Sequence, residues 1–250
     1  MNWDQNGTAN VKASVVNLET PSTNFFIGGG TMEQRACTIF LFVCTVATAK
    51  DVPASDSVKL PEVRLELLGR VKVDQESRHA WIAWMKEHGK QGKVNVADLS
   101  ADRKAEFEKL SAAVKKADEE NTARLGEIVA KHGWPTKTLV GKDGAHAAWL
   151  LVQHSDANVQ FQRKCLDLMV KAPKDEESQT DLAYLTDRVL LAEGKKQLFG
   201  TQFTSSGGKW EPRPLEDPAN VDKRRAEVGL PPLAEYVKVL ESQYGNGSKK

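Results

Sequence analysis

Apolar residues recur at three- and four-residue intervals over most of the chain after residue 60, and this period predicts helices. The first predicted helix covers residues 60–88. The second begins at Asp98 or Ser100, either of which can cap the first turn, and continues to residue 131. The sequence HGWP at residues 132–135 ends it, because glycine can close the last turn and proline cannot continue a helix.

The same period predicts further helices in the second half of the chain. One covers residues 144–154, the next begins after a cap at Asp156, and the others cover residues 179–193, 217–229 and 231–244. Residues 197–204 instead have a strand-like composition, and SSGG at 205–208 is a turn cluster. The predicted fold class is therefore mainly α. We expect an antiparallel helix bundle or a short α-solenoid-like stack, with one small hairpin or ordered loop near residues 197–212.

A different pattern precedes the helices. Residues 36–46 form an uncharged apolar run behind a weakly basic start at Met32, and small residues at 47–49 match a signal-peptidase site. The pattern predicts a signal peptide over residues 32–49, cleavage after Ala49, and a secreted or periplasmic protein. The run is shorter than the ~20 residues that cross a bilayer, so no membrane association is expected after cleavage. The alternative is a cytoplasmic protein in which residues 36–46 belong to the core.

These patterns divide the chain into segments. Residues 1–31 are rich in Asn, Thr and Gly without a helical or strand period, and are interpreted as an unstructured extension or a misassigned start. Residues 50–59 are predicted to be a linker. Residues 60–244 are predicted to be a single helical domain, followed by a disordered tail over 245–250.

Charge and cysteine content remove several classes of partner and cofactor. The formal net charge is +1, whereas binding to nucleic acid phosphates generally needs clustered excess cations, so no nucleic-acid partner is predicted. Two of the 3 cysteines lie in the predicted signal, which leaves Cys165 without a disulfide partner and therefore expected to be buried. The chain has no HExxH or cysteine-rich pattern, so neither a metal nor a cofactor is predicted.

Several motifs with rare residues occur in order: HGWP (132–135), GAHAAWLLVQHSD (144–156), GTQ (200–202) and RRAEVGLPPLAEY (224–236). With them the chain resembles an uncharacterised domain-of-unknown-function family with bacterial and some eukaryotic members. The resemblance covers roughly residues 62–240. It implies no activity, cofactor or catalytic residue.

The candidate catalytic residues are His154, Asp156, Asp187 and His132. His154 is predicted near the end of an apolar helix, where Asp156 or Asp187 could orient its imidazole for acid–base chemistry. His132 is also predicted at a helix C-terminus. In both histidines the imidazole could equally bond to the last carbonyls of its own helix, which is a structural role.

The candidate substrate-binding residues are Gln202, Thr201, Arg188, Trp134 and Tyr184. A Gly-Thr-Gln segment between two aromatic residues suits either a ligand contact or a turn that locks the hairpin. The resulting hypothesis is an exported small-molecule hydrolase or lyase with a histidine–carboxylate pair. The alternative is a noncatalytic ligand-binding or protein-interaction helical module. The sequence decides neither whether the protein is an enzyme nor its oligomeric state.

Overall fold

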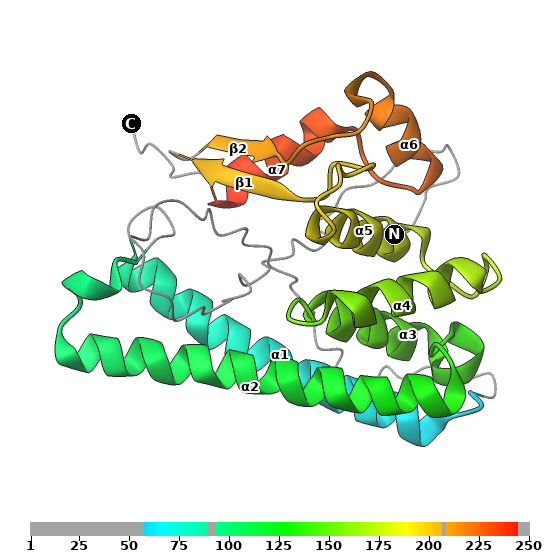
Figure 1. Ribbon diagram of the computed structural model, residues 1–250, viewed down its shortest axis with the longest axis horizontal. Helices are drawn as coiled ribbons and strands as arrows, with labels where there is room; N and C mark the ends of the chain where they lie inside the picture. Colours follow the sequence, from blue (N-terminus) through cyan, green and yellow to red (C-terminus); the bar gives the residue numbers. More distant parts are fainter. Residues whose placement is uncertain (1–57, 90–93, 207–208, 245–250) are drawn as a thin grey trace.

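The computed structural model of the protein describes residues 58–89, 94–206 and 209–244 (Figure 1). The predicted signal peptide, the N-terminal extension, most of the linker and the C-terminal tail lie outside the described residues. None of the helices in the described part is long and apolar enough to cross a membrane.

The described chain is mainly helical with one small antiparallel hairpin, which confirms the predicted fold class. The long helices α1 (Pro61–His88) and α2 (Ala101–His132) are joined by a chain segment that includes the 3-10 turn η1 (Val96–Asp98). The remaining elements are α3 (Lys137–Gln153), α4 (Val159–Lys171), α5 (Gln179–Ala192), β1 (Phe203–Ser206), β2 (Lys209–Pro212), η2 (Pro218–Asn220), α6 (Val221–Glu227) and α7 (Leu233–Tyr244).

The elements lie in layers (Figure 1). Helices α1 and α2 run side by side as a long antiparallel pair, and α3 packs against both of them. Helices α4 and α5 pack against each other and against α3. The hairpin β1–β2, with α7 packed against β2, lies on the far side of α5 from the long pair.

Side-chain caps explain where three of the described helices, α2, α4 and α5, begin. The Ser100 side chain accepts a hydrogen bond from Arg103 N at the start of α2, and Ser178 accepts one from Asp181 N at the start of α5. The predicted cap at Asp156 is wrong, because the capping residue is Asn158, two residues later, and α4 begins at Val159. Asp217 makes no capping bond from its side chain, and a 3-10 turn precedes α6.

Helix α3 begins earlier than the predicted residue 144. Residues 137–140 already form a helical turn, and Gly141 then leaves the helical conformation with φ 76° and ψ 166° before the helix resumes. A side chain at Gly141 would be strained in this left-handed region of φ. The break lets residues 136–140 contact the loop before α5, where Thr138 N donates to Glu176.

The buried apolar side chains form two clusters along the α1–α2 pair. The larger cluster takes Leu67 and Val71 from α1 and Leu125 and Ile128 from α2, and continues through α3 to α5, the hairpin and α7. The smaller cluster lies nearer the α1–α2 connection and comprises Trp81, Ile82, Trp84, Met85 and Val114 with partly buried neighbours. Polar residues occupy the positions between the two clusters.

Candidate functional site

Two charged residues of α1 occupy positions that would ordinarily be apolar. Asp74 and Arg78 follow Val71 and precede Trp81 at three- and four-residue spacing, so the helix turns them toward the interior with the apolar side chains. Their residues are 1% and 2% exposed. Charges at this depth are costly unless they are paired and hydrogen-bonded, so their partners decide what the position can do.

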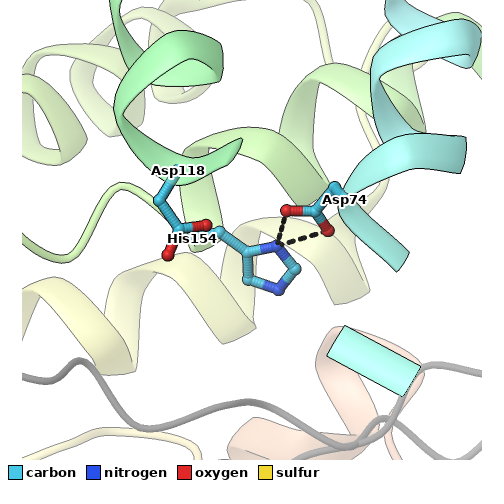
Figure 2. Close-up of side chains that lie close together, drawn as sticks. All are labelled: Asp74, Asp118 and His154. Carbon is cyan, nitrogen blue, oxygen red and sulfur yellow. Dashed lines mark hydrogen bonds and ion pairs between the residues drawn. The ribbon is translucent and has the colours of Figure 1, made fainter. Parts of the chain in front are cut away.

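Those partners come from two other helices (Figure 2). His154, which follows the last residue of α3, places Nδ1 2.9 Å from Oδ2 of Asp74 and 3.1 Å from Oδ1. The Nε atom of Arg78 lies 3.2 Å from both oxygens of Asp74. Nη2 of Arg78 donates to Oδ1 of Asp118 on α2. We call Asp74, Arg78, Asp118 and His154 the polar centre.

The two ring nitrogens of His154 differ in their surroundings. Figure 2 shows Nδ1 facing Asp74 and Nε2 on the opposite side of the ring, away from both carboxylates. Among the described residues, none is hydrogen-bonded to Nε2. This is the arrangement in which a carboxylate orients a histidine and leaves Nε2 to exchange protons with another molecule.

Electrostatics favours a neutral His154 beside an ionised Asp74. Burial and the nearby Arg78 guanidinium lower the pKa of His154, and Asp74 only partly offsets them. Burial alone would raise the pKa of Asp74, but His154 and Arg78 together bring it below its ordinary value. An ionised carboxylate only accepts hydrogen bonds, so Nδ1 of His154 carries the proton and Nε2 is the basic atom.

Asp118 has the opposite protonation behaviour to Asp74. Burial raises the pKa of Asp118 to about 7, and the negative charges of Asp74 and Asp156 add to this rise against the lowering effect of Arg78. Two carboxyl groups on the same arginine thus have pKa values that lie far apart. Separated values of this kind assign one group to hold charge and the other to hold a proton near neutral pH.

Carboxylate and imidazole groups also suit a metal ion, and one ligand atom from each of Asp74, Asp118 and His154 lies within 4.8 Å of the others. The guanidinium of Arg78, however, already binds both carboxylates. A metal ion at this position would have to displace that cation. The donor set therefore fits proton transfer better than metal binding.

Asp156 and Arg188, both predicted site residues, form a pair next to the polar centre. Nη1 of Arg188 lies 2.5 Å from both carboxylate oxygens of Asp156, and its Nε lies 2.7 Å from Oε1 of Gln153. Burial, together with the charge of Arg213, lowers the pKa of Arg188 to about 9. The hydrogen bond to Nδ1 of His154, which was expected from Asp156 or Asp187, is made by Asp74 instead.

Asp187 holds a loop instead of a histidine. Its carboxylate accepts hydrogen bonds from the backbone N–H of Leu198, Phe199 and Thr201, and from the Thr201 hydroxyl. Gln202 donates its backbone N–H to Oε1 of Gln197. Thr201 and Gln202 are 0% and 4% exposed, so their partners lie within the protein.

Two arginines complete the same loop from the other side. Arg224 donates to the carbonyl of Leu198, and Nη1 of Arg225 donates to the carbonyls of Phe199 and Gly200. Gly200 has a φ of 64°, and a Cβ there would lie 2.9 Å from Cδ1 of Leu233. Of the two interpretations of the Gly-Thr-Gln segment, the described contacts fit the turn that locks the hairpin.

The remaining predicted residues are at the end of α2, just after it, and on α5. His132 ends α2, 14 residues after Asp118, which is roughly 21 Å along the helix axis. Nε1 of Trp134 donates to Oε2 of Glu177, and Tyr184 packs edge-on against Trp149 with ring centroids 6.2 Å apart. The structure therefore brings His154 near Asp156 and Arg188, while His132 lies farther along α2, and Trp134 and Tyr184 contact Glu177 and Trp149.

Sequence reasoning missed Asp74, Arg78 and Asp118. A signal was present, because these residues occupy interior positions of otherwise apolar helical stripes, between Val71 and Trp81 on α1 and between Val114 and Leu125 on α2. A charged residue in such a position must find a partner inside the protein. The helical period alone could thus have marked these charges for inspection.

Comparison with known proteins gives a family. A family of unknown function, DUF6624, matches residues 85–249. The chain belongs to DUF6624. This confirms the resemblance to a domain-of-unknown-function family. The DUF6624 match includes Asp118 and His154, whereas Asp74 and Arg78 precede it on α1. No curated protein and no solved structure matches the chain.

Proposed function

We propose that this protein is an acid–base enzyme, a small-molecule hydrolase or lyase, in which His154 is the base and Asp74 orients it. The observation that carries the proposal is the geometry of the imidazole. Its Nδ1 is bound to a buried carboxylate, and its Nε2 points away from that carboxylate without a partner among the described residues. A neutral imidazole held in one orientation can serve as the base in hydrolysis and in proton abstraction from carbon.

The other members of the polar centre have roles that follow from their charges. When Nε2 takes a proton, the imidazolium is stabilised by Asp74, which stays ionised. The proton that Nε2 takes from water or from a carbon acid is the one that the imidazolium then gives to the leaving group, while Asp118, with a pKa of about 7, can carry a proton near neutral pH. Arg78 binds both carboxylates and is a positioning residue.

The functional test compares purified wild-type protein with His154→Gln, Asp74→Asn and His79→Gln on chromogenic esters, amides, glycosides and phosphomonoesters, and on β-elimination substrates. For a substrate that the wild type converts, we expect His154→Gln to lower kcat/KM by about 10²- to 10⁴-fold. Asp74→Asn should lower it less, with a changed pH profile, because the imidazole remains. His79 is exposed on α1 next to Arg78, so His79→Gln is the matched control and should keep full activity.

Two results would overturn the proposal. In the first, the His154→Gln protein, folded by circular dichroism, converts the substrate as fast as the wild type. In the second, the wild type converts none of the panel, which would favour the noncatalytic ligand-binding or interaction module. In that module, the polar centre would only tie α1, α2 and α3 together.

We also propose that the protein is exported through the signal peptide over residues 32–49. The apolar run at residues 36–46 carries this proposal, and Cys165 meets the condition that export sets for a free thiol, because it is buried in the larger apolar cluster and burial raises its pKa to about 12. Such a thiol is shielded from oxidation outside the cytoplasm. N-terminal sequencing of the protein isolated from its source should find Lys50 first, and a chain that begins at Met1 would contradict export.

A further inference from the structure

A second site lies toward the opposite end of α3 from the polar centre. It is a pocket of about 240 Å³, lined by Lys137, Lys142, Ala145, His146, Trp149, Glu177, Ser178 and Asp181. His146 precedes His154 by eight residues, which is roughly 12 Å along the helix. The proposed activity of the polar centre does not use this pocket. A proposal about the pocket can therefore be tested independently of that activity.

Glu177, one of the residues that line this pocket, has a side-chain oxygen without a hydrogen-bond partner among the described residues. The residue is 6% exposed, and its Oε2 accepts a hydrogen bond of 3.1 Å from Nε1 of Trp134. Its Oε1 is buried and has no hydrogen-bond partner among the described residues. A buried carboxylate oxygen without a donor is costly, and because Glu177 lines a pocket, a donor that arrives with a ligand would satisfy it.

The charges around Glu177 indicate what kind of donor this is. Asp181 also lines the pocket and is bound by Nδ1 of His146 at 2.8 Å. The ammonium of Lys137 donates to the backbone carbonyls of Asp175 and Glu177 instead of to the Glu177 carboxylate. Two carboxyl groups therefore line the pocket together with two lysines, and one of these, Lys137, is occupied by main-chain oxygens.

The pKa of Glu177 reflects its burial and the carboxyl groups around it. Burial raises its pKa to about 7, and the negative charges of Asp181 and Glu176 add to this rise, against the lowering effects of Trp134 and Lys137. An anionic ligand would be repelled by the carboxylates. A cationic donor would complete the hydrogen bonding of Oε1 and offset the charge of both groups.

We propose that this pocket binds a small molecule that presents a protonated primary amine to Glu177 and Asp181. An ammonium group has three N–H donors, enough to reach Oε1 of Glu177 and the carboxylate of Asp181 together. The indole of Trp149, on which the His146 ring stacks at 4.9 Å, gives the pocket a flat apolar wall for the body of the ligand. The pocket volume suits a molecule of metabolite size.

The test uses three probes of similar shape and different charge on the full chain at pH 8, where Glu177 is ionised. They are 2-phenylethylamine, 2-phenylethanol and 3-phenylpropanoate, with n-butylamine as a slimmer amine. Binding is followed by NMR through the indole N–H resonance of Trp134, which reports on the hydrogen bond to Glu177. We expect saturable shifts with an amine and none with the alcohol or the carboxylate.

Variants then locate the binding. Glu177→Gln keeps the size of the side chain and should weaken amine binding about tenfold or more, because a hydrogen bond to a charged group is lost. Asp181→Asn, a second variant, should weaken it as well. Asp175→Asn is the matched control, because Asp175 is exposed two residues away and contributes only its backbone carbonyl to Lys137.

Three outcomes would overturn the proposal. They are equal binding of amine and alcohol, preference for the carboxylate, and absence of binding by both amines. Amine binding that survives both Glu177→Gln and Asp181→Asn would also refute it, because the ligand would then lie elsewhere. None of these outcomes depends on catalysis by His154.

Discussion

We expect Asp187→Asn to lower the free energy of unfolding by roughly 3 kcal/mol, because buried donors that lose their acceptor bear a desolvation penalty. Asp187 accepts from three backbone N–H groups, at 2.7 Å from Leu198, 3.0 Å from Phe199 and 2.9 Å from Thr201. The asparagine amide has one oxygen and one NH₂, so at least one of these donors would face another donor.

Urea unfolding measures this effect as a lower transition midpoint with an unchanged slope. The matched control is Asp167→Asn, because Asp167 is exposed on α4 and its Oδ1 lies 3.9 Å from Nη1 of Arg163, its ion-pair partner among the described residues. We expect the control to change stability by less than about 0.5 kcal/mol. Equal stability of Asp187→Asn and wild type would mean that the loop does not depend on this carboxylate.

The second large effect is expected for Arg78→Met, which removes the cation of the polar centre and leaves its volume nearly unchanged. Breaking a buried ion pair from one side costs about 3–5 kcal/mol, because the partner charges remain buried. Here the remaining charge is that of Asp74 and, at high pH, that of Asp118. We therefore expect the full loss at pH 8.

The loss of unfolding free energy in Arg78→Met should shrink as the pH falls, because Arg78 shifts the pKa values of its neighbours. Arg78 lowers the pKa of both His154 and Asp118, so its removal raises both. The folded variant then binds protons that the folded wild type has released, which stabilises the variant relative to the wild type toward pH 5. Unfolding in urea at pH 8 and pH 5 measures the difference.

Histidine NMR provides an independent readout of the same variant. The His154 ring resonance, assigned from its disappearance in His154→Gln, should titrate at higher pH in Arg78→Met than in wild type. Arg163→Met is the control, because Arg163 makes a partly exposed pair with Glu193 that contributes about 1 kcal/mol or less. An unchanged titration of His154 would show that Arg78 does not act on the imidazole.

The sequence was sufficient for the helices whose signals are local. Ser100 and Ser178 cap their helices as expected, because a cap depends on the few residues that follow it. Gly194, with a φ of 74°, follows α5 as the sequence indicated. The cap at Asp156 could not be predicted correctly, because an arginine 32 residues away binds that carboxylate and Asn158 is free to take the capping role.

The candidate site was predictable only in part, for a physical reason. His154 was identified because histidine is rare and chemically informative. Its partner Asp74 is 80 residues earlier, and only the packing of α3 against α1 brings the two together. Asp187 was predicted to be catalytic because its real partners could not be recognised in the sequence. They are backbone N–H groups of a later loop, and every residue type except proline has such a group.

The position of the polar centre along the α1–α2 pair has a consequence for how the molecule holds together. The centre separates the smaller apolar cluster, around Trp81 and Val114, from the main interior around Leu67 and Leu125. Ion pairs and hydrogen bonds, rather than continuous apolar packing, therefore join the outer end of the long pair to the rest of the protein. Salt screens these buried charges only weakly, but Asp118 has a pKa of about 7, so acidity changes the charge of the polar centre. The cooperativity between the two parts is thus a property that pH can change, independently of how well either interior is packed.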